Sequence, residues 1–397
     1  MSNITFLGVG KLGKDCAEVF ASKGHTVTGY DINPFESDYI TQKDTMKEAI
    51  QGSEIIFVAL PTPHHADYDG RYPTSDLEPK DFDYTILKSV VAEANQYCTK
   101  DQLMVIISTT MPGTIREQIA PLASNVRLVY NPYLIALGTI RGDVVNPEMV
   151  MIGTENGDID KDAHELISFY DSVMENEPRV EIFTWEECEL TKIFYNTFIS
   201  AKIVLVNLIQ DLTNKIGNSN VDTITNALAR CDSVIMGPKF MKGGMGDGGP
   251  CHPRDMITVR WIAEKYDLGY DLFGSIMTAR ERQALNMAEY LMSTANGLPV
   301  CVVGTAYKKG VPFEFGSSSI MVGHYLKEIG GEVSYYDPDM CSTIDASVSR
   351  VYLLAHGDDY NIDFTDDSIV VDPWRMYTSE KKLKIIHYGN TKRLTTG

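Results

Sequence analysis

A cysteine that follows a glycine-rich stretch is the side chain of this sequence best suited to covalent chemistry. In the segment GGMGDGGPCHPRD, the many glycines allow the backbone to approach a ligand closely, and Cys251 follows directly. Pro253 suits the first position of a helix and Asp255 its third, where a negative charge is favoured. Cys251 is therefore expected beside a helix N-terminus, whose dipole favours a nucleophilic thiolate. Taken alone, the segment fits a plainer interpretation better: a small apolar cysteine in a loop, followed by a capping aspartate.

A lysine and an asparagine one helical turn apart form a second group that could act on an alcohol or a carbonyl. Lys192 and Asn196 stand at positions i and i+4 in LTKIFYN, so both side chains point from one face of a helix. A cation and an amide on one face could stabilise an alkoxide or a tetrahedral oxyanion. On its own, this pattern fits a solvated lysine and a polar boundary residue better.

The beginning of the chain has the pattern of a dinucleotide-binding unit. GVGKLG follows the apolar run ITFL and opens a helical pattern, so its glycines allow a tight turn, close approach of a pyrophosphate to the helix N-terminus and close helix–strand packing. A second apolar run, HTVTGY, ends at Asp31, whose carboxylate can bind the adenosine ribose and favours NAD over NADP. The alternative is an ordinary glycine turn followed by a surface aspartate. The residues expected to bind the cofactor here are Gly8, Val9, Gly10, Lys11, Leu12, Gly13 and Asp31.

Short apolar runs alternate with helical patterns from residue 3 to about residue 130, and these elements would position the cofactor site. The expected strands are ITFLGV, HTVTGYD, SEIIFVAL, LMVIIS and VRLVYNP. Strands that alternate with helices predict an α/β fold with a doubly wound, mainly parallel sheet of the Rossmann type.

A long helical pattern runs from about Trp185 to Gly217, where Gly217 and Asn218 supply a stop signal, and is expected to bridge two domains. Strand patterns resume after the second glycine-rich stretch with LPVCVVGTAY, GEVSYYDPD, RVYLLAHG and SIVVD. The sequence therefore predicts an N-terminal Rossmann-like domain, a long central helix within a helical domain and a smaller C-terminal Rossmann-like α/β domain. We expect these three domains to cover residues 1–183, 184–294 and 295–397.

The composition indicates a soluble, cytoplasmic protein. Lys and Arg total 35 against 54 for Asp and Glu, and the net charge of -19 argues against a nucleic-acid partner. The 7 cysteines show no paired spacing typical of a zinc site or a disulfide framework, so we expect no metal and a reducing compartment. The start MSNITFLGVG lacks the pattern of a secretory leader, and no apolar run approaches the roughly 18 residues that span a bilayer.

Seven segments, in order along nearly the whole chain, resemble motifs of the UDP-glucose/GDP-mannose dehydrogenase family. GVGKLG is similar to the family's first glycine motif, VALPTP to its loop near the nicotinamide ribose, STTMPGT to its Ser-Thr loop and NPEMVMIG to the segment that closes its first domain. ELTKIFYN is similar to its central-helix Lys/Asn motif, GGPCHPRD to its nucleophile motif Gly-Gly-x-Cys-x-Pro-Lys-Asp and GTAYKKG to the motif that opens its C-terminal domain. Their common order is hard to produce by chance.

The resemblance implies two successive NAD-dependent oxidations that convert the primary alcohol of a nucleotide sugar to a carboxylate, with UDP-glucose as the leading candidate. Cys251 would attack the intermediate aldehyde to form a thiohemiacetal, a second oxidation would leave a thioester, and water would release the acid. Lys192 and Asn196 would stabilise the oxyanions, Asp255 would orient the water or transfer a proton, and Thr109 would lie near the substrate.

The resemblance also implies further binding residues and a homodimer formed through the long central helix. The sugar would bind between two domains, and the C-terminal domain would bind the nucleotide. The additional NAD contacts are Pro61, Thr62, Ser108 and Thr109. The implied substrate contacts are Tyr133, Leu134, Lys192, Asn196, Phe240, Gly248 and Lys308.

Several positions depart from the family pattern, mainly among groups that contact the substrate. The family loop NPEFLREG has two glutamates where NPYLIALG has Tyr133 and Leu137, so base assistance from this loop is in doubt. A family arginine that reaches the substrate of the partner subunit is replaced by Ile235, an aromatic residue by Asp247, and the lysine of the nucleophile motif by Arg254. The family's Arg-Glu-Ser-Pro is replaced by Phe315, Gly316, Ser317 and Ser318.

Two further groups near these motifs have a functional and a plainer interpretation. His252 could replace the missing base, but neighbouring side chains usually diverge, and we expect a solvent-facing imidazole. Lys239 and Lys242 are expected on the surface, whereas Lys308 fits a surface position and a diphosphate contact equally well.

Two alternative functions remain open at this stage. The chain could be a related oxidoreductase that acts on another anionic alcohol, or one that stops at the aldehyde or the thioester because the loop glutamates are absent. It could also be a non-catalytic NAD-binding scaffold or sensor, although the presence of Cys251 together with Lys192, Asn196 and Asp255 argues against this.

Overall fold

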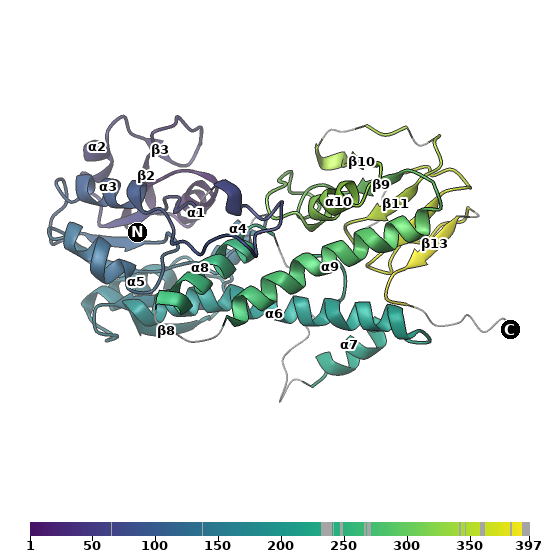
Figure 1. Ribbon diagram of the computed structural model, residues 1–397. Coiled ribbons are helices and arrows are strands. Elements are labelled where there is room, and N and C mark those ends of the chain that lie inside the picture. The colour runs from purple at the N-terminus through teal and green to yellow at the C-terminus, as the bar shows by residue number, and fades with distance from the viewer. Residues whose placement is uncertain are drawn as a thin grey trace. The chain divides into compact units, whose positions relative to one another are not determined.

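The computed structural model describes two compact units that share one long helix (Figure 1). The described residues are 1–390 without 65, 137, 232–239, 241, 247–248, 266, 268–270, 341–342, 346, 358–361 and 382, and without the side chains of residues 208, 212 and 262. The first unit comprises Met1–His64 and Asp81–Tyr195, and the second comprises His65–Lys80 and Asn196–Gly397. The predicted division into three domains is not tested by these two units and stays a prediction.

The first unit is built on an eight-stranded sheet in the order β3-β2-β1-β4-β5-β6-β7-β8. Neighbouring strands are parallel except for β6 and β7. The strands are β1 (Asn3–Leu7), β2 (Thr26–Tyr30), β3 (Thr41–Gln42), β4 (Ile55–Val58), β5 (Leu103–Ile106), β6 (Arg127–Tyr130), β7 (Met149–Thr154) and β8 (Arg179–Thr184). The connecting elements are α1 (Lys11–Ser22), α2 (Met46–Ile50), α3 (Thr85–Ala94), the π-helical turn η2 (Ile115–Ile119), the 3-10 turn η3 (Ala120–Leu122), α4 (Ile140–Val145) and α5 (Lys161–Asp171). This architecture confirms the predicted Rossmann-like, doubly wound sheet.

The core of the first unit explains why these runs become strands. Every residue of β4 and β5 is buried, as is typical of parallel strands covered by helices on both faces. Phe6 stacks on Phe57 with ring centroids 5.1 Å apart, and Phe20 of α1 packs edge-on against Phe169 of α5 at 4.9 Å. The five predicted strands correspond to β1, β2, β4, β5 and β6. The short β3 and the edge pair β7 and β8 were not predicted.

Helix α6 (Trp185–Ile216) is 32 residues long and confirms the predicted central helix. It is followed by Gly217, whose φ of +79° is a left-handed conformation that favours glycine. Among the described helices, α6 is long and apolar enough to cross a bilayer, with an 18-residue window of mean hydropathy 1.3. This is weak evidence for a membrane span, because a helix in a protein core passes the same test. Buried polar side chains such as Asn207 and Gln210, which bond to the backbone of Gly246 and Gly244, are typical of a core helix.

The second unit contains a five-stranded parallel sheet in the order β10-β9-β11-β12-β13. The strands are β9 (Val300–Val303), β10 (Val333–Tyr336), β11 (Val351–Leu354), β12 (Ile369–Asp372) and β13 (Lys384–His387). The helical elements are η1 (Ala66–Tyr68), α7 (Val221–Ala229), α8 (Cys251–Lys265), α9 (Leu272–Ala295), α10 (Ser318–Glu328) and η4 (Pro338–Met340). The four predicted C-terminal strands are confirmed as β9 to β12, whereas β13 was not predicted.

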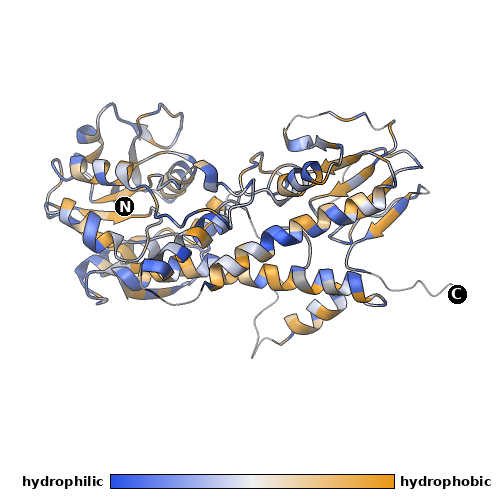
Figure 2. Ribbon diagram, in the orientation of Figure 1, coloured by the Kyte–Doolittle hydropathy of each residue, from blue (hydrophilic) through white to orange (hydrophobic). Residues whose placement is uncertain are grey.

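The two faces of this second sheet follow the alternation of side chains along its strands. Val300, Val302, Val351 and Leu353 pack with residues of α9 and α10 on one face. The intervening residues pack on the other face with Phe364 and Tyr377. Figure 2 shows these strands as mainly hydrophobic, whereas α9 alternates between hydrophobic and hydrophilic residues along its length.

Candidate active site

The glycine turn at the end of β1 has the shape that a dinucleotide requires. Gly8 has a φ of +94°, and a Cβ atom on Gly8 would lie 2.5 Å from the carbonyl oxygen of Ala59. A Cβ on Gly13 would lie 2.1 Å from the carbonyl oxygen of Gly8, so α1 approaches the turn as closely as glycine allows. Gly10, the residue before α1, is exposed and would have no neighbour within 4 Å of a Cβ. A pyrophosphate can therefore approach the N-terminus of α1 over Gly10.

Asp31 lies at the end of β2 beside this turn, as predicted. Its Oδ2 accepts a hydrogen bond from the backbone N–H of Val9 at 2.8 Å, and its Oδ1 accepts one from that of Asn33 at 2.9 Å. Oδ1 also accepts from Asn33 Nδ2 at 3.4 Å. A carboxylate oxygen has two acceptor positions, so Oδ2 can still accept a ribose hydroxyl. The turn, the helix N-terminus and the carboxylate together fit NAD.

The loops that follow β4 and β5 are bonded to each other on the cofactor side of the sheet. Ser108 Oγ donates to the carbonyl of Leu60 at 2.8 Å and accepts from its N–H at 3.0 Å. Thr62 Oγ1 donates to the carbonyl of Thr109 at 2.8 Å. The predicted cofactor residues Thr62, Ser108 and Thr109 thus belong to one hydrogen-bonded arrangement, with Pro61 exposed between the bonded residues.

Lys192 is buried on α6, in contrast to the solvated lysine of the plainer interpretation. Its Nζ donates to the backbone carbonyl of Tyr133 at 2.7 Å. The Tyr133 hydroxyl lies 2.7 Å from that of Tyr170 inside the first unit, and burial raises the pKa of Tyr133 well above its ordinary value. Of the predicted substrate residues in this loop, Tyr133 thus offers its carbonyl to Lys192 while its ring packs inward, and Leu134 is half-buried. Leu137 lies outside the described residues.

Cys251 is the first residue of α8 and is half-buried, which places it at a helix N-terminus as predicted. The predicted positions of the next residues were wrong by two. Pro253 is the third and Asp255 the fifth residue of α8, because the helix begins before the proline. Proline is tolerated there, since the first N–H groups of a helix have no intrahelical acceptor.

Asp255 is fully buried and connects α8 to α6. Its Oδ2 accepts from Asn196 Nδ2 at 2.6 Å, and its Oδ1 accepts from Arg254 Nε at 2.8 Å. The structure therefore brings together two of the predicted catalytic residues, Asn196 and Asp255, and Asp255 is four residues after Cys251 in the sequence.

The prediction of a solvent-facing His252 was wrong. Only 7% of this residue is exposed, and its Nδ1 lies 2.5 Å from Ser200 Oγ on α6. His252 and Asp255 are three residues apart on α8 and both contact α6, where Asn196 and Ser200 are one turn apart. The earlier start of α8 explains the difference, because it places residue 252 inside the helix and on the face that packs against α6.

Gly316, one of the positions that depart from the family pattern, lies against the nucleophile segment, as does Tyr307. A Cβ on Gly249, whose φ is +96°, would lie 2.4 Å from the ring of Tyr307, and one on Gly316 would lie 2.3 Å from the backbone N of Pro250. Burial, together with the proximity of Cys251, raises the pKa of Tyr307. The next residue, Lys308, is exposed.

An arginine that sequence reasoning missed lies over one of these substituted positions. The guanidinium of Arg71 is 4.5 Å from the ring centroid of Phe315, and its Nη2 donates to Asp69 at 2.7 Å.

The predicted substrate residue Phe240 is 44% exposed and has a φ of +59°. Ile235, Lys239, Asp247 and Gly248 lie outside the described residues.

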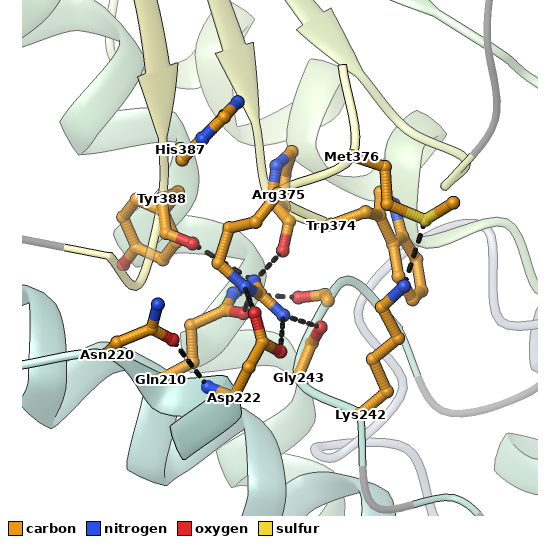
Figure 3. Close-up of polar contacts among 12 residues, drawn as sticks. Gln210, Asn220, Asp222, Lys242, Gly243, Trp374, Arg375, Met376, His387 and Tyr388 are labelled. Atoms are coloured by element: carbon orange, nitrogen blue, oxygen red, sulfur yellow. Dashed lines mark hydrogen bonds and ion pairs between the residues drawn. The ribbon is translucent and has the colours of Figure 1, made fainter. Parts of the chain in front are cut away.

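A second missed arginine fixes the start of the glycine-rich loop (Figure 3). Arg375 follows β12, and its side chain is only 2% exposed. Its guanidinium donates to both carboxylate oxygens of Asp222 at 2.7 and 2.9 Å, to Gln210 Oε1 at 2.6 Å and to the carbonyl of Gly243 at 2.7 Å. Nearby, Lys242 Nζ lies 2.9 Å from Met376 Sδ. Arg375 therefore joins the C-terminal sheet, α6, α7 and the loop that leads to Cys251.

A metal site is not evident in the part of the chain that the structure describes, where no three His, Cys, Asp or Glu side chains gather to hold an ion. The described cysteines 16, 98, 188, 231, 251 and 301 are free thiols.

Comparison with known proteins extends the likeness over most of the chain. Residues 34–172 match the model of the UDP-glucose/GDP-mannose dehydrogenase family, NAD binding domain, and residues 186–282 match that of its central domain. The UDP-glucose 6-dehydrogenase of Rickettsia prowazekii (strain Madrid E) is 24% identical over 357 residues, which cover 85% of this chain and 81% of that protein.

Solved structures show the same fold at low sequence identity. A UDP-glucose dehydrogenase from Pyrobaculum islandicum aligns with a TM-score of 0.74 and 22% identity, covering 97% of this chain and 96% of that one. A UDP-D-ManNAc dehydrogenase from Pyrococcus horikoshii aligns with a TM-score of 0.75 and 19% identity, covering 98% of this chain and 100% of that one.

Proposed function

Because the chain belongs to the UDP-glucose/GDP-mannose dehydrogenase family and has its NAD-binding domain, we propose that it oxidises the primary alcohol of a nucleotide sugar to a carboxylate. UDP-glucose is the leading candidate substrate, since several relatives, among them those of two Rickettsia species, are UDP-glucose 6-dehydrogenases. The observation that carries the proposal is the bond between Asn196 and Asp255, which fixes α8 with Cys251 at its first position. The nucleotide-linked acid would be a building block for polysaccharide synthesis.

The proposed reaction uses Cys251 as a covalent nucleophile. NAD, when bound, supplies the hydride acceptor for both oxidations. The bond from Cys251 Sγ to the substrate carbon forms at the aldehyde and breaks when water attacks the thioester, which returns the thiol. One alcohol, one water and two NAD thus give one carboxylate, two NADH and three protons.

The neighbouring side chains have roles that follow from their hydrogen bonds. Asn196 donates one amide hydrogen to Asp255, which leaves the second for an oxyanion on the substrate carbon. Lys192 Nζ donates to the carbonyl of Tyr133, and its positive charge would stabilise an alkoxide on the substrate. Asp255 accepts from both Asn196 and Arg254, which fixes its orientation toward the water that attacks the thioester. Thr109 would lie near the substrate, with its carbonyl bonded to Thr62.

One observation favours a second candidate, an oxidation that stops at the aldehyde or the thioester. The family loop supplies glutamates where this chain has Tyr133 and Leu137, and the Tyr133 hydroxyl is bonded to Tyr170 in the interior. Burial also raises the pKa of Tyr133 well above its ordinary value, so this hydroxyl is a poor general base for thioester hydrolysis.

The two candidates differ in the number of NADH molecules formed per substrate. A set of nucleotide sugars should be incubated with NAD, with NADH measured by absorbance and the product by mass spectrometry. Two NADH and a uronate support complete oxidation, whereas one NADH or a trapped acyl-enzyme supports the second candidate. Binding of NAD without any reduction would instead indicate a non-catalytic NAD-binding protein.

We also propose a homodimer formed through α6. Phe198, Leu205 and Ile216 are 66%, 60% and 77% exposed, and their spacings of about two and about five helical turns place them on one face. A second copy of the chain would bury this apolar face. Light scattering tests the dimer by comparing the molar mass of Leu205→Glu with that of the parent protein. A charge at Leu205, which lies between the other two residues of this face, should convert the dimer to a monomer.

A cytoplasmic location is proposed as well, because the thiol nucleophile needs a reducing compartment.

A further inference from the structure

A buried carboxylate on α6, which has no role in the proposed reaction, contacts the loop that follows β5. Glu189 is 0% exposed and lies one turn before Lys192. Its Oε1 accepts from Thr110 Oγ1 at 2.9 Å and from the Ile115 N–H at 2.9 Å, and its Oε2 accepts from the Gly113 N–H at 2.7 Å. Three donors from one loop therefore converge on a single carboxylate.

The same loop, residues 108–115, is also bonded to the segment that follows β4, which contains predicted NAD contacts. Ser108 is bonded to Leu60 and the Thr109 carbonyl to Thr62, so the loop is fixed on that side by the segment after β4. Glu189 fixes it on the other side, immediately after Thr109. Loss of the Glu189 contacts would loosen the part of the loop from Thr110 to Ile115, although the N–H groups of Thr110 and Met111 are also bonded to the hydroxyls of Tyr130 and Tyr84.

The three donors select the ionised form of Glu189. Two of them are backbone N–H groups, which can only donate, and their hydrogen bonds to an ionised carboxylate are stronger than those to a neutral carboxyl. Arg116, a cation near this carboxylate, is bonded to Glu186. Burial raises the pKa of Glu189 to about 7, and the three hydrogen bonds oppose that rise. Tyr130, Glu186 and Cys188 interact electrostatically with Glu189. Tyr84 is bonded to the Met111 N–H of the same loop, and Glu155 lies near Arg116.

We propose that ionised Glu189 is a positioning residue that holds residues 108–115 in the conformation that binds NAD. Protonation of the carboxyl weakens the contact with the Gly113 N–H and loosens the loop, so NAD affinity falls as the pH falls. The inference rests on the proposed function for the cofactor alone and is independent of the sugar substrate.

The expected size of the effect follows from the ionised fraction of Glu189. With a pKa of about 7, this fraction is about one tenth at pH 6 and about nine tenths at pH 8. If only the ionised protein binds, the dissociation constant of NAD is about tenfold larger at pH 6 than at pH 8. NAD has no group of its own that titrates in this range.

The test is calorimetric titration of the full chain with NAD from about pH 6 to about pH 8. Glu189→Gln should bind NAD more weakly than the parent protein at pH 8 and should show no change in affinity with pH. Glu187→Gln is the matched control, because Glu187 is exposed on the same helix and its side chain accepts from the backbone N–H of Thr184. This control should keep the affinity and the pH dependence of the parent protein.

Thr110→Val supplies a second, independent test of the pH dependence of NAD affinity. It removes one donor to Glu189 at nearly constant volume, and this donor lowers the pKa of the carboxyl, so the midpoint of the affinity change should move to higher pH. Wild-type affinity or wild-type pH dependence in Glu189→Gln overturns the proposal. If that variant does not fold, an unmoved midpoint in Thr110→Val overturns it. Neither result depends on turnover, so failure here is distinct from failure to oxidise a nucleotide sugar.

Discussion

Replacing Glu189 by glutamine should change how the stability of the protein depends on pH. Burial raises the pKa of Glu189 from 4.5 to about 7 in the folded protein. The folded state then binds the proton more tightly than the unfolded state. The stability that the neutral carboxyl contributes is therefore fully present below about pH 4.5 and is lost as the pH rises through about 7.

The size of this loss can be worked from the two pKa values. Between about pH 5 and about pH 8, proton linkage removes about 2.5 kcal/mol from the free energy of unfolding of the parent protein. For a chain of 397 residues, the entropy of unfolding is about 0.8 kcal/mol per kelvin. The linkage thus lowers the melting temperature by about 3 °C if the whole chain unfolds together, and by more if the first unit unfolds alone.

Thermal unfolding of the two proteins at both pH values isolates this contribution. Glutamine does not titrate, so the cost of its amide beside the N–H donors is the same at every pH. The melting temperature of the parent protein minus that of Glu189→Gln should therefore fall by about 3 °C from pH 5 to pH 8. Glu187→Gln should show no such change. A difference between parent and Glu189→Gln that stays constant with pH would refute the buried, titrating carboxylate.

Three further substitutions test the glycine turn at Gly13, the proposed catalytic role of Asp255 and the bonds that Arg375 makes to the glycine-rich loop. Gly13→Ala should weaken NAD binding by on the order of a hundredfold, because its Cβ would lie 2.1 Å from the Gly8 carbonyl oxygen; Gly142→Ala, with no neighbour within 4 Å, is the control in the same titration. Asp255→Asn should lower kcat by on the order of 100-fold to 10,000-fold while NAD affinity is kept, and equal kcat values would show that Asp255 is not used. Arg375→Met should destabilise the protein by about 3–5 kcal/mol in thermal unfolding, because it leaves the bonds to Asp222, Gln210 and Gly243 unmade; an unchanged melting temperature would contradict its anchoring role.

The sequence was most informative where local spacing determines the structure. The turn at Gly8 and Gly13 needs no distant residue, because a strand, a tight turn and a helix follow each other directly. The position of Cys251 at a helix start and the extent of α6 were likewise predictable from local patterns. The short strand β3 and the edge strands β8 and β13 were missed, since edge strands are only partly buried and lack a continuous apolar run.

Contacts between residues far apart in the chain could not be predicted in this way. His252 was expected in solvent because its burial depends on Ser200, which lies on another helix. The contact of Glu189 with Gly113 and that of Arg375 with Gly243 join segments far apart in the sequence. Each of these side chains alone resembles an ordinary charged residue, and only the tertiary fold distinguishes it from one.

The central claim is that Cys251 carries a four-electron oxidation of a nucleotide sugar. The most direct measurement is the ratio of NADH to uronate formed from the best substrate, for the parent protein and for Cys251→Ala. We expect two NADH per uronate from the parent protein and no uronate from Cys251→Ala, with NAD binding unchanged. Formation of uronate with two NADH by Cys251→Ala would contradict the covalent mechanism.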